Sequence, residues 1–128
     1  RFAIPILFYH PNNSFKGVNN ELSQQLDIFP SIVDLVGYNK PVNTWGRSLF
    51  SDNPNQPFSI NFSGTVYRFS MNNFTLVFDG NEVIGVYSID DHGLEKNIIN
   101  EADYSDEETY LKAFIQDYME RIIDKKLN

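Results

Sequence analysis

Four short segments in which apolar and polar side chains alternate constrain the fold of this chain most. They occupy residues 59–62, 66–71, 74–78 and 83–89, and Ser63-Gly64, Asn72-Asn73 and Asp79-Gly80-Asn81 separate them. Alternation with a period of two is typical of strands that bury one face. Turn residues such as Gly and Asn accept the positive φ that tight hairpins require. The sequence therefore predicts a four-stranded antiparallel meander with one apolar face that another element must cover.

The end of the chain predicts a helix that can cover this face. Ser105 and Glu108 have the spacing of a capping box at a helix start. Acidic residues near this start and Lys125 with Lys126 near the end match the helix dipole. We expect a helix of about five turns. Its apolar stripe consists of Tyr110, Leu111, Phe114, Ile115, Tyr118, Met119, Ile122 and Ile123.

The beginning of the chain predicts a different arrangement. Residues 4–9 are nearly all apolar and do not alternate, which is typical of a strand covered on both faces in an α/β sheet. Because no segment precedes this strand and no initiator Met opens the chain, we expect a C-terminal piece of a larger α/β protein. A helix should follow, with Asp27 as its cap, Pro30 in its first turn and Gly37 at its end. Its buried face should consist of Ile28, Phe29, Ile32, Val33, Leu35 and Val36.

Charge and composition exclude several classes of protein. The chain has 17 Asp and Glu against 10 Lys and Arg, a net charge of −7, without the basic cluster that nucleic-acid binding needs. The absence of cysteine excludes disulfides, thiolate metal sites and a Cys nucleophile. No segment approaches the roughly 20 apolar residues of a membrane-spanning helix. An aromatic content of 15% favours a chain that folds around a packed core.

Three motifs, taken in order, carry a resemblance to a known family. Residues 4–9 read Ile-Pro-Ile-Leu-Phe-Tyr, residues 25–30 read Gln-Leu-Asp-Ile-Phe-Pro at a helix start, and residues 46–49 read Gly-Arg-Ser-Leu before the aromatic hairpins. This order resembles the C-terminal part of sulfatases of the alkaline phosphatase superfamily. It is closest to the branch related to lipoteichoic acid synthase, the phosphoglycerol transferases. The resemblance covers essentially the whole chain.

The resemblance implies an enzyme whose reaction centre precedes this chain. Such enzymes use a nucleophile, formylglycine in sulfatases or Thr in the lipoteichoic acid synthase branch, while a divalent metal stabilises charge on the ester oxygens. It implies that this chain alone has no nucleophile, metal ligand or cofactor, and is inactive. Its partner would be the remainder of the parent catalytic domain, which acts on a sulfate or phosphate ester. The parent would lie outside the cytoplasmic membrane, in the periplasm or at the cell surface, with or without a membrane anchor.

Three residues are candidates for the rim of the substrate site in the parent. Arg47, in an ordered loop, can bind a sulfate or phosphate through its fork of donors, and a structural salt bridge is the competing interpretation. Trp45 can stack on a sugar ring or anchor the loop in the core. His10 follows the predicted strand at the sheet edge where α/β proteins bind ligands, and the alternative is a solvated side chain.

Two further motifs favour structural interpretations. Asp91-His92-Gly93 is similar to the metal-binding motif of the family, but it follows the meander and offers two ligands where a catalytic metal needs at least three. We predict a surface turn there, with Gly93 providing backbone freedom. Asp27 and Asp34 lie on one side of the predicted helix, where capping for Asp27 and exposure for Asp34 are favoured over acid–base chemistry.

The sequence thus predicts an α+β chain in two parts. Residues 1–57 should form the last strand, helix and loop of a catalytic α/β domain, and residues 58–128 an antiparallel C-terminal subdomain with a terminal helix. The expected function is the structural C-terminal portion of a metal-dependent sulfatase. The alternatives are a fragment of a phosphoglycerol- or phosphoethanolamine-type transferase, and a non-enzymatic module that binds a glycan or a protein. Without neighbours, the strand at residues 4–9 should promote self-association.

Overall fold

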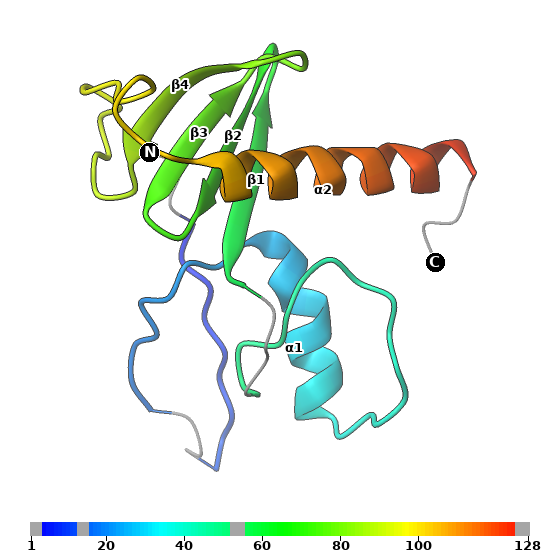
Figure 1. The fold of residues 1–128 in the computed structure, drawn as a ribbon. Coiled ribbons are helices and arrows are strands. Elements are labelled where there is room, and N and C mark those ends of the chain that lie inside the picture. Colours follow the sequence, from blue (N-terminus) through cyan, green and yellow to red (C-terminus); the bar gives the residue numbers. More distant parts are fainter. Residues whose placement is uncertain (1–3, 13–15, 52–55, 125–128) are drawn as a thin grey trace.

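The computed structural model describes residues 4–12, 16–51 and 56–124 of the 128-residue chain. A short 3₁₀ turn, η1 (Gln25–Asp27), leads directly into helix α1 (Ile28–Leu35). Four strands follow, β1 (Phe58–Ser63), β2 (Val66–Met71), β3 (Phe74–Phe78) and β4 (Val83–Ser88), and helix α2 (Ser105–Ile123) ends the fold. The α+β class is confirmed (Figure 1).

The sheet is an antiparallel meander in the order β1-β2-β3-β4, as the alternating segments predict. Gly64 and Asn72 adopt positive φ in the first two hairpins, where such a backbone is needed. The register pairs Phe69 with Leu76 and Leu76 with Val86, so the apolar residues of neighbouring strands share one face. A bulge at Val77 and Phe78 shifts the register toward β4.

Helix α2 crosses the apolar face of the sheet and closes the core (Figure 1). Leu111 is fully buried against the sheet, and Tyr110 packs on Phe58 and Phe69 with ring centroids 5.3 and 6.0 Å apart. Burial of each such side chain contributes about 1.5–3 kcal/mol. The buried apolar residues are Phe58, Phe69, Met71, Leu76, Phe78, Val83, Val86 and Leu111.

The second half of α2 extends past the sheet (Figure 1). Its apolar residues Tyr118, Met119, Ile122 and Ile123 are exposed, so the predicted stripe is buried only along the first turns. The predicted capping box is wrong, because Ser105 is already the first helical residue and its hydroxyl donates to Asp103. None of the helices in the described ranges is long and apolar enough to cross a membrane.

The strand predicted at residues 4–9 does not form. Residues 4–10 have no regular secondary structure, and Leu7 is 89% exposed. A strand needs a neighbour that completes its backbone hydrogen bonds, and among the described residues the sheet contains only β1 to β4. Phe8 contacts the ring of Phe50 edge-on at 4.9 Å and thereby connects this segment to the loop before β1.

Helix α1 forms where the sequence predicts it, and Gly37 follows it with a φ of 72°. Its expected buried face is wrong, because Phe29, Ile32, Leu35 and Val36 are exposed. The buried positions are Pro30 and Ser31, on the side of the helix that the following loop contacts. The apolar side of α1 therefore lacks a cover in the described part of the chain.

Candidate functional site

The loop at residues 44–50 is attached to the start of α1 through the Asp27 carboxylate. One carboxylate oxygen accepts from the Arg47 backbone N–H and the other from that of Gln24, both at 2.9 Å. Asp27 is only 3% exposed, so these bonds compensate the cost of burying its carboxylate. Asp27 occupies the N-cap position of α1, as predicted, but its carboxylate caps no N–H of α1 and accepts instead from the Gln24 N–H at the start of η1.

Gly46 lets the loop approach this helix start closely. A Cβ atom at residue 46 would lie 2.0 Å from the carbonyl oxygen of Leu26, a distance no side chain tolerates. The carbonyl belongs to the backbone and has no flexible end that could move aside. A glycine is therefore required where the loop meets the 3₁₀ turn.

Two hydroxyls continue the attachment along α1. The Ser48 hydroxyl donates to the Asp34 carboxylate at 2.6 Å. The Ser31 hydroxyl donates to the Asp27 carbonyl at 2.6 Å and accepts from the Leu49 N–H at 3.0 Å. Asp34 is exposed, as predicted, although it also accepts this hydrogen bond. The Gly-Arg-Ser-Leu motif is thus held on α1 by side chains from successive turns.

Arg47 projects from this loop into an ion pair. Its Nη2 donates to Glu21 at 2.8 Å and to the Leu22 carbonyl at 3.4 Å. The Arg47 side chain is 11% exposed, whereas that of Glu21 is 60% exposed. The Arg47 Nε is buried without a hydrogen-bond partner among the described residues, as is the Gln24 amide nitrogen. The structural salt bridge, which the sequence left open as the alternative to anion binding by Arg47, is therefore present.

Trp45 projects from the same loop onto the second half of α2. Its Nε1–H donates to Asp117 at 2.5 Å, and the Arg121 guanidinium lies 4.5 Å from the ring centroid. The indole also packs against Phe114 and Tyr118. The hydrogen bond from Trp45, followed by the bond and charge of Arg121, holds the pKa of Asp117 below its ordinary value. This environment assigns Trp45 an anchoring role in the isolated chain.

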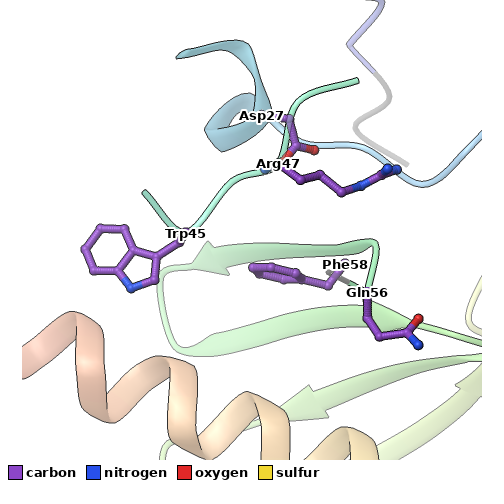
Figure 2. A pocket seen from close by; sticks show the side chains of 5 residues that line it. All are labelled: Asp27, Trp45, Arg47, Gln56 and Phe58. Carbon is purple, nitrogen blue, oxygen red and sulfur yellow. The ribbon is translucent and has the colours of Figure 1, made fainter. Parts of the chain in front are cut away.

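A small pocket lies between Trp45 and Arg47. It has a volume of about 10 Å³, which accommodates about one water molecule. Figure 2 shows that the two side chains extend in opposite directions from the loop, with Asp27, Gln56 and Phe58 completing the lining. A sugar ring or an ester does not fit into this volume.

His10 lies apart from this pocket. It is exposed at the end of the irregular segment, and its Nδ1 accepts a hydrogen bond from the Asn12 N–H at 3.3 Å. It is absent from the residues that line the pocket, whereas Trp45 and Arg47 both line it. The structure therefore brings two of the three candidate rim residues together.

The Asp-His-Gly motif forms an exposed turn after β4, as predicted. Asp91 accepts from the backbone N–H groups of Lys96 and Glu95, both at 2.9 Å, and these bonds lower the pKa of its carboxyl group. The residue with left-handed backbone is Leu94, with a φ of 54°, so the predicted role of Gly93 is wrong. In residues 4–12, 16–51 and 56–124, no group of three or more His, Asp or Glu could hold a metal ion.

Sequence analysis missed two elements of this site. Asp117 and Arg121 have the four-residue spacing of a helical ion pair, a signal from which their salt bridge at 2.9 Å could have been predicted, although not their contact with Trp45. The bond between Asp27 and the Arg47 N–H joins residues 20 positions apart and left no local signal. Comparison of the chain with models of protein families, with curated proteins and with solved structures finds no match.

Proposed function

We propose that this chain is the C-terminal structural portion of a metal-dependent sulfatase of the alkaline phosphatase superfamily. The nucleophile and the metal ligands would lie in the remainder of the parent catalytic domain. The support from sequence is the resemblance of residues 4–9, of the helix that begins near Asp27 and of the Gly-Arg-Ser-Leu motif. The chain alone would be inactive, and its role would be to complete the catalytic domain.

The distribution of buried residues in the two parts of the chain carries this proposal. In the described part of the chain, all buried hydrophobic residues apart from Pro30 belong to positions 58 and beyond, where the sheet and α2 form their own core. Among the described residues before Phe58, the buried polar side chains are Asp27, Ser31 and Ser48. Of the large apolar side chains of α1, Phe29, Ile32 and Leu35 are exposed, and the other two are half-buried. This inverted pattern is typical of a surface that a further protein layer covers.

The exposed apolar side chains are the surface to which we assign the parent domain. They come from the segment at residues 4–9, from α1 and from the residue that follows α1, and large exposed apolar surfaces mark interaction sites. The segment at residues 4–9 has the apolar sequence of a strand and exposes most of its side chains, so a sheet edge in the parent would complete its backbone hydrogen bonds. The residues of this surface are Ile4, Leu7, Tyr9, Phe29, Ile32, Leu35 and Val36.

Of the three proposed rim residues, Arg47 has the strongest chemical case. Its partner Glu21 is largely exposed, so a sulfate or phosphate ester could replace that carboxylate without burying an unpaired charge. Trp45 would act indirectly by holding the loop against α2. His10 lies apart from both and would reach the rim only through the segment that the parent domain orders.

A phosphoglycerol- or phosphoethanolamine-type transferase is the second candidate. Sulfate and phosphate esters are both tetrahedral anions, and the sequence resembles the lipoteichoic acid synthase branch most closely. Both candidates place the parent outside the cytoplasmic membrane, in the periplasm or at the cell surface. A non-enzymatic binding module is the rival from another class.

The decisive experiment expresses the complete protein encoded by the reading frame that contains this chain. Hydrolysis of para-nitrophenyl sulfate and transfer of glycerophosphate from phosphatidylglycerol are measured with and without EDTA, and the 128-residue chain serves as the inactive control. EDTA-sensitive sulfate hydrolysis is expected, and EDTA-sensitive transfer would establish the second candidate. The complete protein could show neither activity, or have no region upstream that carries a nucleophile and metal ligands. Either result would contradict both enzymatic candidates and favour the non-enzymatic binding module.

A further inference from the structure

The guanidinium group of Arg47 is nearly removed from water but only partly hydrogen-bonded. Its side chain is 11% exposed, and its bonds to residues 21 and 22 both start from Nη2. The Glu21 carboxylate accepts at 2.8 Å, whereas the Leu22 carbonyl lies at 3.4 Å, beyond the usual range. The buried Nε–H meets no acceptor in the described part of the chain. Arg47 therefore has donor capacity that its present partners do not use.

The Nε and Nη2 atoms of an arginine share one edge of the guanidinium plane. Their N–H groups are parallel, and this edge binds two oxygens of a carboxylate, sulfate or phosphate at once. Glu21 contacts the edge through one oxygen, Oε2, and only at Nη2. The ion pair is thus a one-point contact on an edge that accommodates two-point binding.

The two partners of this ion pair are held very differently. The buried Asp27 carboxylate fixes the Arg47 backbone N–H at 2.9 Å, and the preceding Gly46 is packed tightly against η1. Glu21 ends a stretch, residues 16–21, in which every residue is exposed and which forms no helix or strand. Moving Glu21 therefore breaks no core contact, whereas moving Arg47 would disrupt the attachment of the loop to η1.

Asp27 does not serve as the counter-ion of the guanidinium. Its two oxygens accept from the backbone N–H groups of Arg47 and Gln24, and the Arg47 side chain extends away from it (Figure 2). Asp27 also lies where η1 passes into α1, at the positive end of the helix dipole. The two N–H groups and the dipole compensate its charge, so the guanidinium depends on Glu21 for its own compensation.

We propose that Glu21 is a displaceable counter-ion, which occupies the anion site of Arg47 until a sulfate or phosphate group replaces it. The inference rests on the proposed function, because it assigns a means of regulation to the same site. An anion that binds both Nε and Nη2 gains a second charge-assisted bond and releases Glu21 into water. Competition from Glu21 would therefore favour ligands that present two oxygens over a simple ion such as chloride.

The test titrates the full 128-residue chain with sodium sulfate, with chloride keeping the ionic strength constant. NMR signals of the Arg47 Nε–H and of the amides at residues 21–24 and 46–48 are recorded. We expect saturable shifts, and Glu21→Gln should tighten sulfate binding about threefold to fivefold, because it removes the internal competitor. Arg47→Gln should abolish the amide shifts. Glu101→Gln is the matched control, since it removes the same charge from another exposed ion pair and should leave the affinity unchanged.

Three outcomes would overturn the inference. The first is the absence of shifts in Glu21→Gln at millimolar sulfate. The second is an equal effect of Glu21→Gln and Glu101→Gln, which would reflect net charge alone. The third is equal affinity for chloride and sulfate, which would indicate an adventitious ion only.

The titration needs no enzymatic activity, so its result and that of the activity assays are distinguishable. Sulfate binding that tightens in Glu21→Gln, together with an inactive complete protein, would contradict the proposed function and retain the anion site. An active complete protein whose isolated 128-residue chain shows no such tightening would contradict the role of Glu21 alone.

Discussion

Trp45 donates its indole N–H to Asp117, and the same carboxylate forms an ion pair with Arg121. Arg121 covers the indole ring at 4.5 Å and also donates to Asn43 in the loop. A loop that precedes the sheet is thereby held by a helix 72 positions later in the sequence. The cluster connects the part of the chain before β1 to the core of the part after it.

The pH dependence of this cluster is testable. The hydrogen bond from Trp45, and then Arg121, hold the pKa of Asp117 below 3.8 in the folded state. A lowered folded pKa means that the stabilisation is present above pH 3.8 and is lost as the pH falls through the folded value. Trp45→Phe removes the donor but keeps an aromatic ring, so the pKa of Asp117 should rise toward 3.8.

NMR titration of the side-chain carboxyl carbons measures this change. Asp103 is the internal control, because its pKa is lowered by hydrogen bonds from Ser105 and should stay the same in the variant. An unchanged Asp117 titration in Trp45→Phe would show that the indole N–H does not stabilise the carboxylate.

Asp27→Ala should destabilise the chain by about 2–4 kcal/mol, because two poorly accessible N–H groups, those of Gln24 and Arg47, lose their acceptor. Urea unfolding followed by circular dichroism measures the loss. Asp34→Ala is the matched control, since Asp34 is exposed and accepts from one hydroxyl only. Equal losses for the two variants would contradict the central role of Asp27.

Gly46→Ala and Gly64→Ala separate steric contact from backbone conformation. Gly46→Ala places a methyl group against the Leu26 carbonyl and should lower the free energy of unfolding by about 3 kcal/mol or more, with displacement of the Arg47 amide NMR signal. The methyl group of Gly64→Ala would lie in open space, but the backbone there has a φ of 69°, so the loss should be about 1 kcal/mol. The midpoint of urea unfolding should therefore be lower for Gly46→Ala than for Gly64→Ala. The reverse order would contradict the close approach of loop and helix.

Leu7→Asp should reduce self-association of the isolated chain. Leu7 is almost fully exposed within an apolar segment, and such segments pair with copies of themselves. Sedimentation velocity at several protein concentrations measures the effect. Val18→Asp, at an exposed residue in a polar loop, is the control and should associate like the unmodified chain. A monomeric unmodified chain would argue against the proposed interface.

The sheet was predictable because its signals are local. Alternation places Phe69 and Leu76 on one face, and hairpin residues such as Gly64 fix where each strand ends, so the expected strands and the observed ones agree within one residue. Leu111 was predictable for the same reason, since its stripe repeats with the helix period.

The misassigned features depend on contacts between distant residues. An apolar sequence at residues 4–9 gives the preference for a strand, but only a neighbouring strand can complete one, and none of the described residues supplies it. Asp27 occupies the predicted cap position, but its carboxylate accepts from the Arg47 and Gln24 N–H groups and from no N–H of α1. The candidate site was predictable as a loop with an anchored Trp45, but its partners on α2 were not.

Helix α2 is longer than the sheet it covers, and different turns of it serve different neighbours. Leu111 is seated in the sheet core, while Arg121, ten positions or about 15 Å further along, holds the loop. The orientation of α2 on the sheet therefore also fixes the position of the loop. A change in packing around Leu111 that tilts the helix would displace Trp45 and Arg47, although Leu111 itself does not contact the loop.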